Sequence, residues 1–424
     1  MGSSGGSGEH ASDRTQFAPS DDTWADVNEN WANVDELAAS RPVEPSPTRT
    51  DSLEATRRRQ RSRSSGRASS RRRAVVSRLV TQLYTLSYLV FFSFFGTLAR
   101  LGLTALTRYP GAPVIFSSIW SNFAGCIVMG FLAEDRRLFR HEWGEGPSSS
   151  ASSSPGPEAA KAHLAAKKTI PLYIGLATGF CGSFTSFSSF IRDVFLAMTD
   201  DLYRPVTAEV RIPGEGGRSS GRAFMALMAV VIATVSLSLS GLFMGAHLAL
   251  ATERVLPSLP QPVTRRYVDP IGVVLGWGCW LGAILLCALP PHDEWRGVLF
   301  ALVFAPLGTL LRFYLALWLN GRQPAFPLGT FTANMLGTAV LGMAWDIAHV
   351  PIGGVVGCQV LTGIGDGFCG CLTTISTWAA ELSSLRRRHA WVYGVVSVVV
   401  AFALLVLIMG GLRWTHGFAM LECH

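Results

Sequence analysis

The chain has 424 residues, of which 49% are hydrophobic and only 15% are charged, and its formal net charge is +7. Soluble domains carry about 25% charged residues, so the composition excludes an ordinary soluble enzyme. Nine of the 36 lysines and arginines lie between Arg57 and Arg73. The remaining 27 are fewer than the 29 acidic residues of the chain. The positive balance is therefore no sign of a basic folded surface.

Residues 1–78 are predicted to form a disordered, arginine-rich cytoplasmic tail, because they contain too few aliphatic residues to build a core. The arginines come just before an apolar run, which favours attraction to anionic lipid headgroups. Nucleic acid is not an expected partner, because no aromatic residues are interleaved with the arginines.

From about residue 79 onward, long apolar runs alternate with short polar breaks. Runs of 18 or more apolar residues are typical of membrane-spanning helices, whereas barrel strands would be shorter and alternating. The sequence therefore predicts an all-α membrane protein with nine transmembrane helices. They are expected at 80–106, 112–133, 169–197, 223–250, 268–289, 297–319, 327–347, 352–382 and 390–412.

The loops between these segments carry their positive charges unevenly. If the tail is cytoplasmic, the basic loops 134–168 and 252–267 and the arginines at 386–388 all fall on the cytoplasmic side, as the positive-inside rule requires. We therefore expect a cytoplasmic N-terminus and an external C-terminus.

Three motifs recur in the same order in the two halves of the chain. The first motif is Gly-Thr-Leu-x-Arg, the second is Asn-x-x-Gly, and the third is Gly-Phe-Cys-Gly followed by a run rich in serine and threonine. Their copies begin at Gly96 and Gly308, Asn122 and Asn334, and Gly179 and Gly367.

The motifs define two four-helix repeats, at 79–251 and 294–424, and the segment 252–293 between them holds one further helix. Because four is an even number, this single extra crossing makes the second repeat begin on the other side of the membrane. The two repeats are therefore expected to be inverted relative to each other, joined by a linker helix.

The third motif predicts a broken helix in each repeat, since closely spaced glycines precede a run of serine and threonine. A helix break inside a membrane is tolerated only where the freed backbone groups find partners. Carbonyl groups freed in both halves can coordinate a hard monovalent cation such as Na⁺ without any carboxylate.

Arg100 and Arg312 lie near span ends, and Asn122 and Asn334 lie within spans. The arginines either bind the carbonyls of a broken helix or form an anion-attracting vestibule. The asparagines either form interhelical hydrogen bonds or solvate an anion with their amides. Phe187 and Phe190 share one helical face, and rings there either pack in a core or offer electropositive edges to a small anion.

These motifs resemble the fluoride channels of the bacterial small-dimer family, in their fused two-domain eukaryotic form. The resemblance covers residues 86–250 and 297–412. It implies a passive, highly selective fluoride channel in the plasma membrane, with a structural Na⁺ between the inverted halves. Because the fused halves complete one unit, we expect a monomer.

The resemblance also assigns roles to individual residues. It implies that Na⁺ is held by the backbone carbonyls of Gly182, Thr185, Gly370 and Thr373. It places a fluoride pore along Asn122, Asn334, Phe187, Phe190, Ser118, Thr330, Ser186, Ser188, Ser189, Thr374, Ser376 and Thr377. It also adds the serines Ser236 and Ser397 of the fourth helix in each repeat.

The second half departs from this pattern. Ile375 and Trp378 replace the two phenylalanines, and Asp366 stands where the first half has Thr178. We therefore predict one working pore, which uses the phenylalanines of the first half, and one vestigial pore. Asp193 and Glu381 occupy matching positions after the breaks and are interpreted as vestibule or capping groups.

Two other classes of protein compete with a channel. An inverted-repeat secondary transporter of small ions would need a titratable carboxylate at the midplane of both halves, and Asp366 offers one in a single half. A membrane scaffold would not need the repeated polar motifs. An enzyme is not expected, because no set of nucleophile, base and acid residues is placed convincingly.

Overall fold

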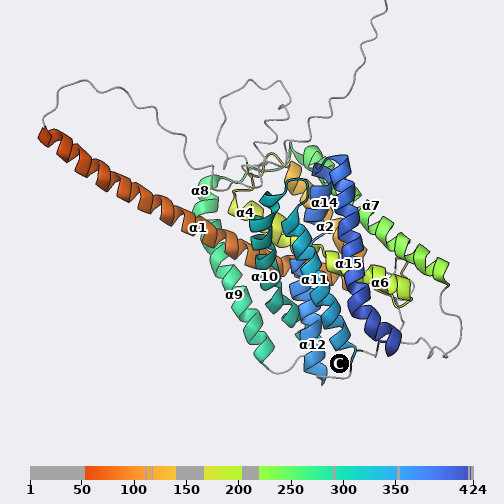
Figure 1. Cartoon of the computed structure of the whole chain (residues 1–424). Coiled ribbons are helices and arrows are strands. Elements are labelled where there is room, and N and C mark those ends of the chain that lie inside the picture. The colour runs from red at the N-terminus through yellow and green to blue at the C-terminus, as the bar shows by residue number, and fades with distance from the viewer. Residues whose placement is uncertain are drawn as a thin grey trace, which may run out of the picture.

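The structure is a computed structural model that describes residues 53–109, 112–139 apart from 115 and 117, 167–202, 219–289, 293–350, 354–418 and 421. Over these residues the chain forms helices and no strand, and the helices assemble into one bundle (Figure 1). The predicted all-α class is confirmed.

The first repeat has long helices at both ends and, between them, a shorter helix and an interrupted one. Its elements are α1 (Leu53–Thr107), α2 (Ser118–Glu134), α4 (Pro171–Ile174), η4 (Gly175–Cys181), α5 (Gly182–Phe184), α6 (Phe187–Thr199) and α7 (Ser220–Thr252).

A linker helix separates this repeat from the second, which has the same order of elements. The linker consists of α8 (Gln261–Val263), η5 (Thr264–Val268) and α9 (Asp269–Ala288). The second repeat consists of α10 (Asp293–Leu319), η6 (Asn320–Arg322), α11 (Leu328–Ala348), α12 (Gly354–Gly363), η7 (Ile364–Cys369), α13 (Gly370–Leu372), α14 (Ser376–Ser384) and α15 (Arg387–Thr415).

The broken third helix predicted for each repeat is present. A short π-helical segment, η4 or η7, comes directly before each break. The backbone then leaves the helix at Thr185, with φ −98° and ψ 148°, and at Thr373, with φ −91° and ψ 152°. The two breaks therefore have nearly the same geometry.

Seven of the nine predicted spans, in the described part of the chain, are long and apolar enough to cross a membrane. The other two correspond to α2, which has 17 residues, and α11, which has 21. These two helices carry Asn122 and Asn334.

Part of the predicted tail is helical. We expected disorder up to residue 78, but α1 begins at Leu53 and contains the arginine-rich stretch. Arginine and alanine are good helix formers, and an apolar helix that follows them supplies the nucleus, so the helix extends backward. The expectation for residues 1–52 lies outside the described residues.

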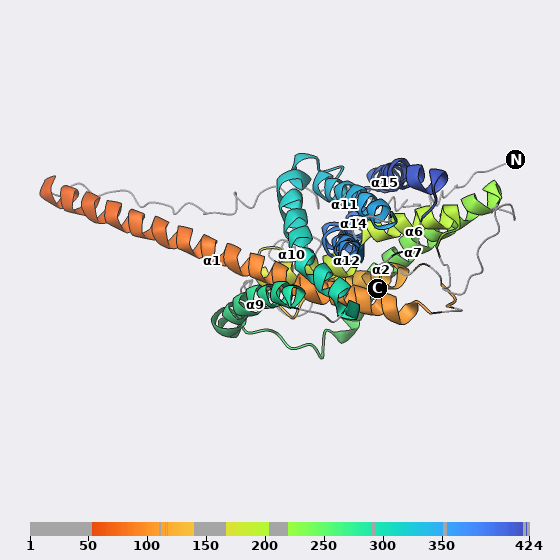
Figure 2. The same ribbon diagram turned by 90° about the horizontal axis from the view of Figure 1, so that it is seen from below.

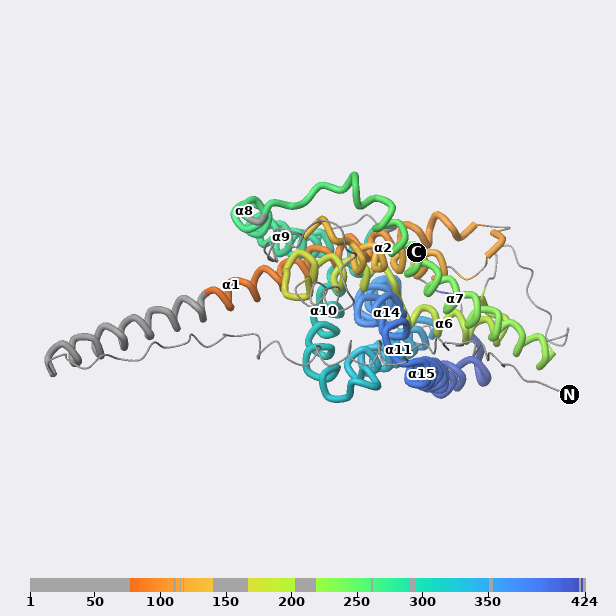
Figure 3. Tube along the Cα trace, turned by 90° about the horizontal axis from the view of Figure 1, so that it is seen from above, coloured from red at the N-terminus to blue at the C-terminus, as the bar shows by residue number. Residues whose placement is uncertain are grey.

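The two repeats interlock. Their first helices, α1 and α10, pack against each other (Figure 2). After its break, each third helix packs against the opposite repeat: α6 contacts α11 and α15, and α14 contacts α2 and α7. Figure 3 shows α14 in the centre of the bundle. Neither repeat therefore buries its broken helix alone.

The linker helix is docked on α1 by polar contacts. Tyr88 Oη donates to Asp269 Oδ1 at 2.8 Å, and Trp277 Nε1 donates to Ser87 Oγ at 2.9 Å. Gly276 lies directly against the Ser87 carbonyl, where a Cβ would stand 2.6 Å from the oxygen. The linker therefore does more than invert the second repeat, because it also packs closely on the first.

Two glycines of α9 make a matched test of this docking. We expect Gly276→Ala to lower the melting temperature of the detergent-solubilised protein, because overpacking against backbone costs about 1–3 kcal/mol. A Cβ on Gly278 would meet no atom within 4 Å, so Gly278→Ala should raise stability by up to about 1 kcal/mol through helix propensity. Equal shifts for both variants would contradict close docking of α9 on α1.

Candidate functional site

The candidate site is the region where the two helix breaks meet. The hydroxyl of Thr185 accepts hydrogen bonds from the backbone N–H groups of Ile375, at 3.2 Å, and Ser376, at 3.1 Å. The hydroxyl of Thr373 likewise accepts from the backbone N–H of Ser188 at 3.1 Å. Each repeat thus caps the helix that follows the break in the other repeat.

A cluster of buried hydroxyl groups surrounds each cap. In the first cluster, Ser188 Oγ lies 3.0 Å from Thr373 Oγ1, and Ser186 Oγ donates to Ser189 Oγ at 2.9 Å. Ser186 Oγ also lies 3.3 Å from Thr373 Oγ1. Four of the predicted pore and cation-site residues are therefore brought together by hydrogen bonds.

The second cluster has the matching arrangement. Thr185 Oγ1 lies 3.1 Å from the hydroxyls of both Thr374 and Ser376. Thr377 joins through its backbone N–H, which donates to Thr374 Oγ1 at 3.4 Å. Both clusters contain neutral hydroxyl groups, which can donate to an anion or accept from a neighbour.

The two asparagines bind the backbone just after the breaks. Asn122 Oδ1 accepts from the Ser186 N–H at 2.8 Å, and its amide donates to the Ser186 carbonyl at 3.4 Å. Asn334 makes the same pair of bonds with Thr374, at 2.9 and 3.3 Å. An amide has two N–H donors, so each side chain keeps one after making these bonds.

The aromatic residues after the first break are completely buried. The rings of Phe187 and Phe190 meet edge to face, with centroids 5.7 Å apart and planes at 79°. Phe187 also contacts Trp378 of the second repeat, with centroids 5.5 Å apart. Ile375 takes the position in the second repeat that matches Phe187. The second repeat therefore has no aromatic ring at this position.

The two matching carboxylates bind hydroxyl groups in the first turns of α2 and α11, and Asp193 also accepts a backbone N–H there. Asp193 Oδ2 accepts from the Ser118 hydroxyl at 2.6 Å and from its N–H at 3.3 Å. Glu381 accepts from the Thr330 hydroxyl at 2.6 Å and from the Tyr393 hydroxyl at 2.7 Å. The predicted hydroxyls Ser118 and Thr330 are therefore placed by these acids.

The matching acids lie at opposite ends of the bundle. Ser118, bonded to Asp193, begins α2, whereas Lys167 donates to the carbonyls of Leu132 and Ala133 at its other end. Glu381 lies at that Lys167 end. There, burial lowers the pKa of the neighbouring Lys168 to about 8, and the charge of Glu381 opposes the shift. In an inverted repeat, matching residues such as Asp193 and Glu381 are expected at opposite ends of the bundle.

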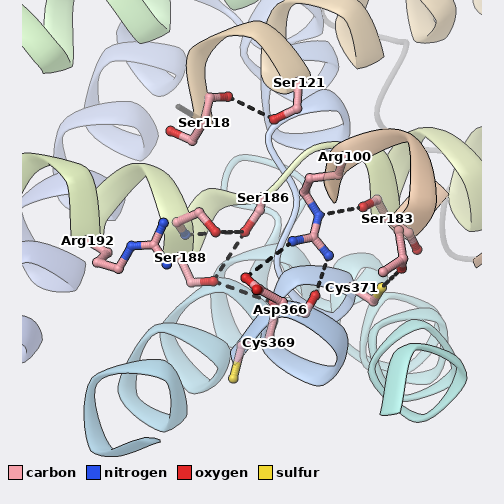
Figure 4. Close-up of polar contacts among 12 residues, drawn as sticks. Arg100, Ser118, Ser121, Ser183, Ser186, Ser188, Arg192, Asp366, Cys369 and Cys371 are labelled. Atoms are coloured by element: carbon pink, nitrogen blue, oxygen red, sulfur yellow. Dashed lines mark hydrogen bonds and ion pairs between the residues drawn. The ribbon is translucent and has the colours of Figure 1, made fainter. Parts of the chain in front are cut away.

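Arg100 is buried between the repeats, with 4% of its surface exposed (Figure 4). Its Nε donates to the Ser183 carbonyl at 3.0 Å, and its Nη2 donates to the Asp366 carbonyl. The Asp366 carboxylate lies 3.9 Å from Nη1. Arg100 thus binds carbonyls beside both breaks, which is the first of the two interpretations that its sequence position allowed.

Arg312 occupies the matching place, with 3% of its surface exposed. Its Nη2 donates to the Thr178 carbonyl at 2.8 Å. Its guanidinium lies so close to Gly182 that no Cβ would fit there, just as Arg100 excludes a Cβ at Gly370. Both arginine side chains are therefore almost completely covered by the described part of the protein.

An open cavity of about 240 Å³ lies instead at the Asp193 end of the bundle. Its lining includes the basic residues Arg108 and Arg192, the acids Asp193 and Asp366, and Trp345. The guanidinium carbon of Arg192 lies 5.3 Å from the ring centre of Trp345. Sequence reasoning missed these two arginines, because one lies in a loop and the other belongs to no repeated motif.

The breaks also fit the carbonyl cation site that the sequence suggested. Among the described residues, no hydrogen bond reaches the carbonyl oxygens of Thr185 or Thr373. Gly182 and Gly370 begin the short helices that pack against each other just before the breaks. Neutral carbonyl oxygens are hard ligands of the kind that a small monovalent cation requires.

The two serines that the resemblance assigns to the fourth helices differ in burial. Ser236 is exposed on the surface of α7, whereas Ser238 is buried with 1% of its surface exposed. Ser397 of α15 is buried, and its hydroxyl donates to the Tyr393 carbonyl at 2.7 Å. The exposed Ser236 therefore lies outside the buried core of the bundle, unlike Ser397.

The fold and the site together define a membrane protein built from two repeats whose broken helices cap each other. The family described as "CrcB-like protein, Camphor Resistance (CrcB)" matches residues 87–246 and 299–411. The chain belongs to this family.

Individual relatives agree with this assignment. The chain is 58% identical over 383 residues to "Fluoride export protein 1" of Neurospora crassa, covering 83% of the chain and 71% of that protein. It is 34% identical over 330 residues to "Fluoride export protein 1" of Candida albicans, covering 76% and 78%.

A bacterial relative is as long as a single repeat. The "Fluoride-specific ion channel FluC" of Pseudomonas paraeruginosa is 35% identical over 127 residues, covering 29% of this chain but 98% of that protein. This pattern fits a two-domain fusion. No solved structure matches the chain.

Removing one capping hydroxyl tests the reciprocal caps. We expect Thr185→Val, which keeps the shape of the side chain, to lower the free energy of unfolding by about 1–3 kcal/mol, because two buried N–H groups of α14 lose their acceptor. Thr185→Ser keeps the hydroxyl and should retain most of the stability. Both are measured by thermal unfolding in detergent, and indistinguishable melting temperatures would rule the cap out.

Proposed function

We propose that the protein is a passive, highly selective fluoride channel that exports fluoride from the cytoplasm across the plasma membrane. The observation that carries this proposal is the pair of buried hydroxyl and amide clusters at the helix breaks, next to the edge-to-face rings of Phe187 and Phe190. The names of the relatives support fluoride as the ion transported.

Selectivity in this proposal comes from dehydration. Amide N–H groups, hydroxyl groups and ring edges replace the water around a small anion in a narrow path. None of these groups carries a formal charge. They therefore solvate the ion less tightly than a cationic side chain in direct contact would bind it. Chloride is larger and accepts weaker hydrogen bonds, so the same groups compensate its dehydration less well.

The driving force is the membrane potential. A negative interior favours the exit of an anion by about 2.3 kcal/mol per 100 mV, so no coupled ion or nucleotide is required. This direction assumes a cytoplasmic N-terminus and an external C-terminus, which the distribution of basic loops supports. The cavity at the Asp193 end is then the external vestibule, and the Lys168 end is cytoplasmic.

A structural Na⁺ belongs to the same proposal. The carbonyls of Gly182, Thr185, Gly370 and Thr373 would hold it where the two breaks meet. Its role there is to compensate the freed carbonyl dipoles and to fasten the two inverted repeats together.

One path conducts in this proposal and the other is vestigial. The difference in ring edges between Phe187 with Phe190 and Ile375 with Trp378 supports the path at the first break. The fused halves complete this unit, so the proposed state is a monomer embedded in the bilayer. The arginine-rich part of α1 is suited to anionic headgroups.

The alternatives are less well supported. A coupled transporter would need titratable acids at the midplane of both halves. The matching acids Asp193 and Glu381 lie instead at opposite ends of the bundle, and Asp366, which pairs with Arg100, has Thr178 as its counterpart. The relatives are named as exporters and a channel, and the chain is a membrane transport protein and not an enzyme.

Fluoride efflux from liposomes tests the proposal directly. Purified protein is reconstituted into vesicles loaded with potassium fluoride, and efflux is started with valinomycin in a K⁺ gradient. We expect fluoride to leave only after valinomycin is added, and vesicles loaded with chloride to show no comparable loss. An absence of electrogenic fluoride efflux from correctly folded protein would refute the proposal.

The single working path predicts unequal effects of two substitutions. Phe187→Ile, which copies the second repeat into the first, should abolish fluoride efflux because the polarised ring edge is lost. Ile375→Ala at the matching position should leave much of the efflux intact. Initial efflux rates at equal protein density provide the comparison, and equal losses would contradict one working path.

A further inference from the structure

The two buried guanidinium groups have matching positions but different partners. Arg100 makes hydrogen bonds to two carbonyls and also faces the carboxylate of Asp366. Arg312 has one hydrogen bond, to the Thr178 carbonyl. Its Nε and Nη1 have no hydrogen-bond partner among the described residues.

This difference comes from one position of the repeat. Asp366 in η7 corresponds to Thr178 in η4, so the first repeat has no acid with which to pair the arginine that reaches it. The charge of Arg100 is therefore balanced locally, and the charge of Arg312 is not. In a medium of low dielectric constant an unbalanced charge acts over several ångströms.

Arg312 is placed to act on the first break. Its guanidinium packs on Gly182, three residues before Thr185, whose hydroxyl belongs to the buried clusters. Its two unpartnered nitrogens are closed off from solvent by protein. The charge therefore attracts an anion near the break without contacting it directly. The anion is then not bound so tightly that it cannot leave.

We propose that Arg312 is the unpaired cation that draws fluoride into the path beside the first helix break, and that Asp366 withholds this attraction from the path beside the second break by neutralising Arg100. This inference rests on the fluoride conduction proposed above. It adds a cause of the asymmetry between the paths that is independent of the aromatic rings.

The charge difference and the ring difference favour the same side. The first break has the unbalanced Arg312 together with Phe187 and Phe190. The second break has the paired Arg100, and its Asp366 carboxylate lines the open cavity with 30% of its surface exposed. Asp193 and Asp201 line the same cavity together with Arg108 and Arg192, and Asp366 adds a further negative charge on the side of the second break.

Charge-altering variants of the full chain in liposomes test the inference. Arg312→Gln removes the charge and should raise the fluoride concentration for half-maximal efflux about tenfold, which corresponds to about 1.4 kcal/mol. Arg312→Lys keeps the charge and should stay within about threefold of the unmodified protein. If both variants have the same half-saturating concentration, the role of the charge is overturned.

Asp366→Asn provides a second arm that does not depend on the folding of the Arg312 variants. It removes a negative charge with little change of shape and leaves Arg100 unbalanced. We expect the half-saturating fluoride concentration to fall about threefold or more, because the cavity proposed as the external vestibule then also loses a negative charge. An unchanged or increased value would overturn the role of Asp366.

The same measurements separate the two proposals. If the unmodified protein carries no fluoride, the proposed function fails. If it carries fluoride and none of the charge variants changes the half-saturating concentration, fluoride conduction stands and the electrostatic inference fails.

Discussion

A helix that breaks inside a membrane exposes backbone N–H groups where no water can satisfy them, and the architecture of this protein depends on how they are satisfied. The hydroxyl of Thr185 receives the N–H groups of α14, and the hydroxyl of Thr373 receives one of α6. These acceptors come from the opposite repeat and add to the local caps, in which Ser186 and Thr374 accept from the N–H groups of Ser189 and Thr377. This exchange explains why the chain needs two repeats and why they must be inverted.

The other repeated motifs serve the same junction. Gly96 and Gly308 allow α1 and α10 to approach the carbonyls of Phe180 and Phe368, which a side chain would block. Each asparagine then binds the backbone that follows a break, and each arginine reaches across to the opposite glycine. The motifs therefore recur because the junction has two equivalent sides. The two sides of the junction differ in the charge near the arginines and in the aromatic rings after the breaks. The proposed function depends on these two differences.

Sequence reasoning predicted the parts of the site that rest on local pattern. Glycines followed by serine and threonine predicted both breaks, and three motifs in the same order predicted the repeat. It could not choose between alternatives that depend on a distant partner. Whether Arg100 binds a carbonyl or lines a vestibule depends on Asp366, which lies 266 residues away along the chain.

Other features left no signal in the sequence. Arg108 and Arg192 meet only through the folding of distant segments around the cavity, so their shared location could not be read from spacing. The exposure of Ser236 depends on the rotation of a helix that is apolar on all sides, where periodicity carries little information. The locations of these side chains therefore depend on how the helices pack, which the sequence pattern does not show.

The central claim is passive conduction that is selective for fluoride, and a reversal potential tests it most directly. The protein is inserted into a planar bilayer with a tenfold fluoride gradient and equal chloride on both sides. The account predicts a reversal potential near the fluoride equilibrium value, about 59 mV, with no shift when a chloride gradient is added instead. A reversal potential of zero under the fluoride gradient, or one that follows chloride, would contradict the account.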